Sequence, residues 1–98
     1  MKFSVVILPE HPWDQAVSIW QRAERLGFEQ AWTYDHLAWR TLADGPWYAA
    51  MPTLTAAALA TTTMRIGTLV ASPNFRHPVP FAKELVTLDD ISGRRLTL

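Results

Sequence analysis

Four short apolar segments recur along the chain, and their spacing constrains the fold more than any other feature. They lie at residues 3–8, 30–35, 65–71 and 95–98. The spacing is about 30 residues, which is the length of a strand with its crossover helix. Strands separated by helices run parallel, because a tight turn cannot return the chain in the same direction. The spacing therefore predicts a parallel α/β sheet.

Three helices are predicted between these strands. The first covers residues 14–26, whose apolar positions follow helical spacing, and Gly27 is placed to end it in a left-handed conformation. The second begins at a proline and covers the alanine-rich stretch and its threonine-rich end, residues 52–63. The third begins at Pro80 and ends before Gly93.

The first strand and the turn after it reduce the number of possible architectures. Residues 3–8 read FSVVIL, a pattern typical of a strand that is buried on both faces. The turn, LPEHPWDQ, has no glycine, whereas dinucleotide-binding folds use glycines here to approach a pyrophosphate. Two architectures remain open. One is a four-stranded α/β domain, and the other is a portion of a (β/α)₈ barrel, which in full needs about 250 residues.

Composition excludes several classes of function. Hydrophobic residues make up 49% and charged residues 18% of the 98 residues, which fits one domain with a core. The net charge is zero, so neither a nucleic-acid partner nor a membrane surface is expected. Cysteine is absent. The first apolar run is too short for a signal peptide, and no stretch approaches a membrane span. We therefore expect a soluble, cytoplasmic protein.

Asp35 and His36 are the strongest chemical signal in the sequence. They follow the second predicted strand, at the carboxyl end where parallel α/β folds place reactive groups. Histidine exchanges protons near neutral pH, and an adjacent carboxylate can orient it. The alternative is a polar pair that only closes the strand.

Two further loops end at the same predicted edge. Trp39 lies in the loop after the second strand, where an aromatic side chain is typical of a pocket wall for a flat ligand. Arg76, in the loop after the third strand, could hold an anion, pair with Asp35 or remain solvated. The three histidines lack the spacing of a metal site, so no metal is expected.

Almost the whole chain resembles the luciferase-like monooxygenase family, most of all its branch that uses the deazaflavin coenzyme F-420. The resemblance runs over GFEQAWTYDHLAWR, residues 27–40, and over residues 52–98. Its marks are the Asp–His pair, the Gly–Thr–x–Val segment at 67–70, the Pro–x–Phe–Arg loop at 73–76 and the Ser–Gly–x–Arg turn at 92–95. Together these marks are specific, although each one is weak alone.

The resemblance implies a fold and an activity. The fold is a (β/α)₈ barrel, of which residues 1–98 would be a single incomplete domain, the N-terminal portion of about three and a half units. Family members form dimers and act on small organic substrates. They transfer hydride with deazaflavin, or insert oxygen with reduced FMN, which is the alternative cofactor.

The resemblance also implies site residues. Asp35 and His36 match the catalytic pair, and His36 would contact the deazaflavin ring. Leu69 and Val70 match a pair that is often joined by a cis peptide bond behind the ring, and Ser72 matches a cofactor-contacting hydroxyl. The phosphate site of such barrels usually comes from strands seven and eight, which are absent here. A non-catalytic fragment that self-associates or needs a complementing partner is therefore the alternative.

Overall fold

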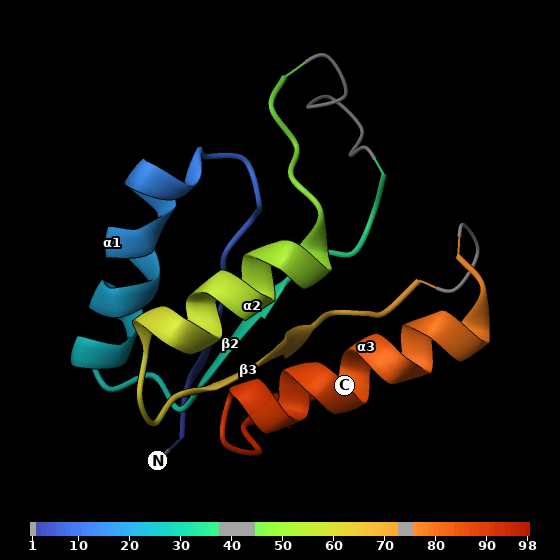
Figure 1. Ribbon diagram of the computed structural model, residues 1–98. Helices are drawn as coiled ribbons and strands as arrows, with labels where there is room; N and C mark the ends of the chain where they lie inside the picture. Colours follow the sequence, from blue (N-terminus) through green and yellow to red (C-terminus); the bar gives the residue numbers. More distant parts are fainter. Residues whose placement is uncertain (1, 38–44, 73–75) are drawn as a thin grey trace.

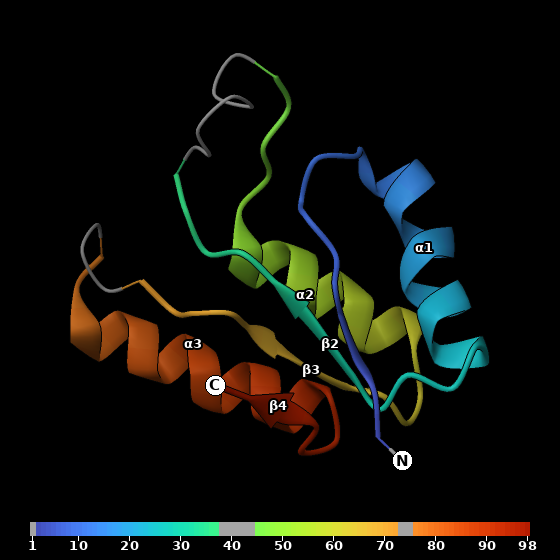
Figure 2. The ribbon, with the colours of Figure 1, turned by 180° about the vertical axis from the view of Figure 1, so that it is seen from behind.

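The structure, a computed structural model, describes residues 2–37, 45–72 and 76–98. Within these residues the strands form one sheet in the order β1-β2-β3-β4, and every neighbouring pair is parallel, as predicted. The helices cover one face of this sheet (Figures 1 and 2). The elements are β1 Ser4–Val6, α1 Trp13–Arg25, β2 Gln30–Thr33, α2 Ala50–Ala60, β3 Arg65–Thr68, α3 Pro78–Ile91 and β4 Leu96–Thr97.

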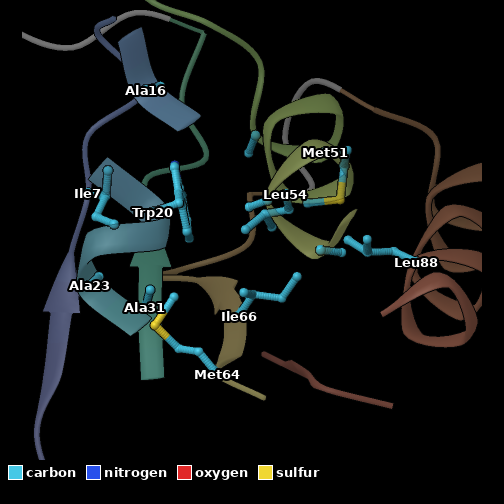
Figure 3. Close-up of a cluster of buried hydrophobic side chains, with 13 residues drawn as sticks. Ile7, Ala16, Trp20, Ala23, Ala31, Met51, Leu54, Met64, Ile66 and Leu88 are labelled. Atoms are coloured by element: carbon cyan, nitrogen blue, oxygen red, sulfur yellow. The ribbon is translucent and has the colours of Figure 1, made fainter. Parts of the chain in front are cut away.

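The core lies between the sheet and the helices. Ala31 of β2 and Ile66 of β3 are neighbours in the sheet register, and both side chains are fully buried under the helices (Figure 3). Trp20 of α1 and Leu54 of α2 fill the layer above them. Alternate residues of a strand point to opposite faces, so Trp32 points to the face without helices.

The strands differ from the prediction in length and, for β1, in burial. β1 is not buried on both faces, because its residues are exposed or only partly buried. It lies at the edge of the sheet with β2 as its one neighbour, and the helices cover a single face. The apolar run FSVVIL is therefore half covered within the described part of the chain.

Two helices begin two residues earlier than predicted, and both shifts follow from proline chemistry. α2 begins at Ala50 and α3 at Pro78, so Pro52 and Pro80 lie inside the first turn. Amides of the first turn have no partner within the helix, and a proline there loses no hydrogen bond. In α3 the ring Nδ1 of His77 accepts a hydrogen bond from the amide of Val79 at 3.2 Å.

α2 ends at Ala60, before the threonines that were predicted to continue it. The carboxylate of Glu24, at the end of α1, accepts hydrogen bonds from the backbone amides of Thr62, Thr63 and Met64, at distances of 2.8–3.1 Å. These amides cannot serve both the carboxylate and a longer helix. A long-range contact thus decides where α2 stops.

Arg95 holds the same turn from the opposite side. Its guanidinium donates hydrogen bonds to the carbonyls of Ala58, Thr61 and Met64, at distances of 2.7–3.2 Å. Carbonyls at the end of a helix lack partners within the helix and carry partial negative charge, so a cation stabilises them. Glu24 and Arg95 together fix the start of β3.

We predict that Glu24→Gln lowers the free energy of unfolding by about 1–2 kcal/mol, because charged hydrogen bonds to three amides become weaker ones. Urea denaturation at pH 7 measures this change. Glu29→Gln is the matched control, because Glu29 makes a surface ion pair with Lys2 and such pairs contribute little. An equal loss in both variants would contradict the role given to Glu24.

The contribution of Glu24 to the free energy of unfolding depends on pH. Burial raises the pKa of Glu24, but the hydrogen bonds from Met64, Thr63 and Thr62 outweigh it, so the pKa lies below its ordinary value of 4.5. The unfolded chain therefore takes up a proton first as the pH falls. The stability difference between wild type and Glu24→Gln is full above pH 4.5 and shrinks as the pH falls through the folded-state pKa.

We predict that Gly67→Ala destabilises the sheet by about 2 kcal/mol or more, since a forced backbone shift in a packed region is costly. A Cβ at Gly67 would lie 1.9 Å from the carbonyl oxygen of Thr97 and 2.9 Å from the ring of Trp32. Because the first obstacle is backbone, β4 would have to move. Amide exchange of β4 and thermal unfolding measure the effect, and unchanged exchange with unchanged stability would contradict it.

Candidate active site

The carboxyl ends of β2 and β3 lie side by side and bring the predicted site residues together. Thr33 and Thr68, the last residues of these strands, are paired in register. The amide of Leu69 donates to the carbonyl of Thr33 at 2.9 Å, so the pairing extends one bond further. Figure 2 shows the chain leaving both strands toward the same edge of the sheet. Residues 34–37 and 69–72 form this carboxyl edge.

Asp35 is buried at the carboxyl edge and is fully engaged in hydrogen bonds. Its carboxylate accepts a hydrogen bond from the amide of Ser72 at 2.7 Å. Arg76 binds it with two nitrogens, Nη1 on Oδ2 and Nη2 on Oδ1, the latter at 2.9 Å. Nη1 of Arg76 also donates to the carbonyl of Ser72 at 2.6 Å. Of the three alternatives for Arg76, the structure shows the ion pair with Asp35.

The environment keeps Arg76 charged and oriented. The hydrogen bond with Asp35 raises the pKa of Arg76 and outweighs the lowering by burial. The guanidinium carbon lies 4.3 Å from the centre of the Phe81 ring, a cation–π contact with the first turns of α3. Arg76 thus joins the carboxyl edge to α3.

His36 is exposed at the edge, beside the buried Asp35. Its ring meets the ring of Tyr34 edge to face, with centroids 6.0 Å apart and planes at 87°. Its carbonyl accepts a hydrogen bond from the indole nitrogen of Trp47 at 2.8 Å. The backbone and ring of His36 are therefore held at an exposed position of the carboxyl edge.

Leu69 and Val70, the pair that the resemblance places behind the ring, lie on the neighbouring segment, after β3. The Leu69–Val70 peptide bond is cis, which confirms the geometry that the family resemblance implied. Leu69 is 42% exposed and Val70 69% exposed, so two apolar side chains face outward at the carboxyl edge. Ser72 is partly buried, and its backbone is held by Asp35 and Arg76. Contact of these residues with a cofactor stays a prediction.

A small cavity of about 180 Å³ opens at this edge. It is smaller than a typical ligand pocket of about 300–1,000 Å³. Trp39, predicted as a pocket wall, lies outside the described residues. The cavity is lined by Asp35, His36, Leu37, Trp47, Tyr48, Ala49, Ala50 and Arg76.

Sequence reasoning did not assign a site role to Trp47, Tyr34 or Phe81. Trp47 and Tyr34 belong to a group of aromatic residues between positions 32 and 48, close to Asp35 in the sequence, and this clustering is the available signal. Phe81 gave no signal, because its contact with Arg76 depends on where α3 begins. Across the described residues no group of three or more His, Asp or Glu side chains is placed to hold a metal ion. No helix in these segments is long and apolar enough to span a bilayer.

The chain matches known proteins over its full length. The family model for luciferase-like monooxygenases covers residues 1–98. The chain is 34% identical over 95 residues to a 5,10-methylenetetrahydromethanopterin reductase of Methanopyrus kandleri, covering 97% of this chain and 25% of that protein. It is 31% identical over 108 residues to the 4-hydroxyprotoasukamycin monooxygenase of Streptomyces nodosus subsp. asukaensis, covering 100% of this chain and 28% of that protein.

Solved structures of related enzymes also match the fold of this chain. The coenzyme F-420-dependent tetrahydromethanopterin reductase of Methanopyrus kandleri matches with a TM-score of 0.82 at 34% identity, over 97% of this chain and 25% of that one. An F-420-dependent secondary alcohol dehydrogenase, in complex with an F-420–acetone adduct, matches with a TM-score of 0.81 at 25% identity, over 100% of this chain and 31% of that one.

The parallel βα units and the polar groups at their carboxyl edge define an α/β chain that is the N-terminal portion of a (β/α)₈ barrel, as predicted. It belongs to the luciferase-like monooxygenase family. The chain spans about a quarter of the length of the curated relatives that it matches.

We predict that Asp35→Asn lowers the free energy of unfolding by about 2–4 kcal/mol, because it leaves the guanidinium of Arg76 without its counter-charge in a largely buried place. Urea denaturation measures the loss. Asp90→Asn, at an exposed position of α3, is the matched control and should change the free energy by less than about 0.5 kcal/mol. A loss for Asp35→Asn as small as that of the control would contradict the structural role of the pair.

Proposed function

We propose that this chain binds the deazaflavin coenzyme F-420 at its carboxyl edge, as part of an oxidoreductase that acts on a small organic substrate. The observation that carries the proposal is that His36 and the apolar side chains of Leu69 and Val70 are all exposed at the same carboxyl edge. The F-420-dependent enzymes among the structural matches support the choice of cofactor. FMN is the alternative, and the monooxygenase relative supports oxygen insertion as the alternative to hydride transfer.

The residues present fit the ring of such a cofactor. Leu69 and Val70 offer an apolar surface to one face of a flat ring, and His36 offers a group that can donate or accept a proton at its edge. Asp35, held by Arg76, would form the catalytic pair with His36. The hydroxyl of Ser72 would contact the cofactor. When bound, the coenzyme supplies the redox chemistry, while these side chains bind and orient it.

Trp39 would form the wall of the substrate pocket. The small volume at the edge leaves room for part of a cofactor, so the remainder of the site would come from chain beyond these elements or from a partner. This observation also favours the second candidate function, a non-catalytic fragment that self-associates or needs a complementing partner. Several large apolar side chains are exposed, including Phe3, Leu59 and Leu98, which supports association as a dimer. A cytoplasmic location is part of the proposal.

Titration of the purified chain with oxidised and reduced F-420, and with FMN, tests the proposed function. Binding is followed by the cofactor's absorbance and fluorescence, and size-exclusion chromatography with light scattering gives the mass of the complex. We expect saturable binding of F-420 that is weakened at least about tenfold in His36→Ala, because a ring contact is lost. Arg25→Ala, at an exposed position in the last turn of α1, is the control and should bind like the wild type.

Two results would contradict the proposed function. One is an absence of saturable binding of F-420 and FMN by the folded chain. The other is binding that His36→Ala leaves unchanged. Tighter binding of FMN than of F-420 would support the alternative cofactor.

A further inference from the structure

Two segments that carry the predicted cofactor contacts meet at Arg76. His36 follows β2, and the apolar pair Leu69–Val70 follows β3, so their relative position depends on what ties the two segments together. The strand ladder ends with the bond between Leu69 and Thr33. Beyond this bond, the described parts of the two segments are joined by hydrogen bonds among Asp35, Ser72 and Arg76.

These three residues form a closed ring of hydrogen bonds. Asp35 accepts from the amide of Ser72 at 2.7 Å, and Arg76 donates to the carbonyl of Ser72 at 2.6 Å. The guanidinium closes the ring by binding both oxygens of Asp35. The carboxylate side chain is 2% exposed and the guanidinium side chain 18% exposed, so water screens the pair little. The side chain of Arg76 therefore fixes Asp35, the residue before His36, against Ser72, which lies two residues after Val70.

We infer that Arg76 is a positioning residue of the site: through Asp35 and the backbone of Ser72, it sets the distance between His36 and the Leu69–Val70 pair. The inference rests on the proposed function, because it assigns Arg76 a role in cofactor binding without contact with the cofactor. The contact with Phe81 extends this control to α3, which begins two residues after Arg76. The flat, forked guanidinium is required, since a lysine ammonium cannot bind two carboxylate oxygens and a carbonyl in one plane.

Arg76→Met and Arg76→Lys test the inference in the 98-residue chain. The dissociation constant for F-420 is measured at a temperature well below the unfolding midpoint of each variant, so that only folded protein is compared. We expect the dissociation constant to rise about tenfold or more in Arg76→Met, because small misplacements of binding groups are costly. Arg76→Lys keeps the positive charge beside Asp35 and serves as the second variant if Arg76→Met fails to fold. Its dissociation constant should remain at least about fivefold above that of the wild type.

A matched control and a double-mutant cycle separate a positioning role of Arg76 from a general loss of cofactor affinity on removing an arginine. Arg22→Met removes an exposed arginine of α1 and should leave the dissociation constant unchanged. If Arg76 acts through Asp35, the double variant Asp35→Asn/Arg76→Met should bind no more weakly than the weaker single variant. Additive losses would overturn the inference, as would a normal dissociation constant in Arg76→Met and Arg76→Lys.

Amide exchange in the cofactor-free chain tests the same inference independently of the proposed function. We expect Arg76→Lys to speed exchange at the amide of Ser72 and at residues 35–37, and to leave exchange at the Glu24 turn, residues 62–64, unchanged. If the wild type binds neither F-420 nor FMN, the proposed function fails, and exchange alone decides the role of Arg76. Unchanged exchange at residues 35–37 and 72 would then overturn it.

Discussion

The buried carboxylate of Asp35 is the group on which the rest of the carboxyl edge depends. A carboxylate that leaves water must find hydrogen-bond donors and an opposite charge, or burial becomes too costly. Here the donors come from Ser72 and Arg76, both of which lie beyond β3. Satisfying one buried charge thus forces the segment after β2 and the segment after β3 to stay together, and it places His36 at the surface of their junction.

The amino edge of the sheet, where the strands begin, follows the same principle, but there the two charged side chains bind backbone groups and not each other. Glu24 satisfies the free amides of the turn between α2 and β3, and Arg95 satisfies the free carbonyls at the end of α2. The two edges differ in what remains exposed. At the amino edge the charged side chains join α1, α2 and the start of β4. At the carboxyl edge His36 and the apolar side chains of Leu69 and Val70 are exposed.

Local patterns were sufficient to predict the order and direction of the elements. The spacing of apolar segments gave the parallel sheet, and Gly27 ends α1 with a φ of 90°, as its position predicted. The errors lie where distant residues decide. α2 stops at Ala60 because Glu24 takes the next amides, and β1 is half exposed because the helices cover one face of the sheet.

In the site, too, local patterns predicted some features, whereas distant residues decided others. Asp35 and His36 could be found from their place at the end of a strand. The partner of Asp35 could not be chosen from the sequence, because Arg76 lies 41 residues away and local residue spacing does not predict contacts over such a separation. The resemblance to the family supplied the cis bond between Leu69 and Val70, which no residue pattern predicted. Resemblance and residue chemistry therefore contributed different parts of the site.

The central claim is that the carboxyl edge, held by Asp35 and Arg76, is a deazaflavin site. Chemical-shift mapping of the isotope-labelled chain during addition of F-420 tests it most directly. The account predicts saturable shifts at His36 and at residues 69–72, with the turn at residues 62–64 unchanged. Shifts confined to the amino edge or to the outer faces of the helices would contradict it.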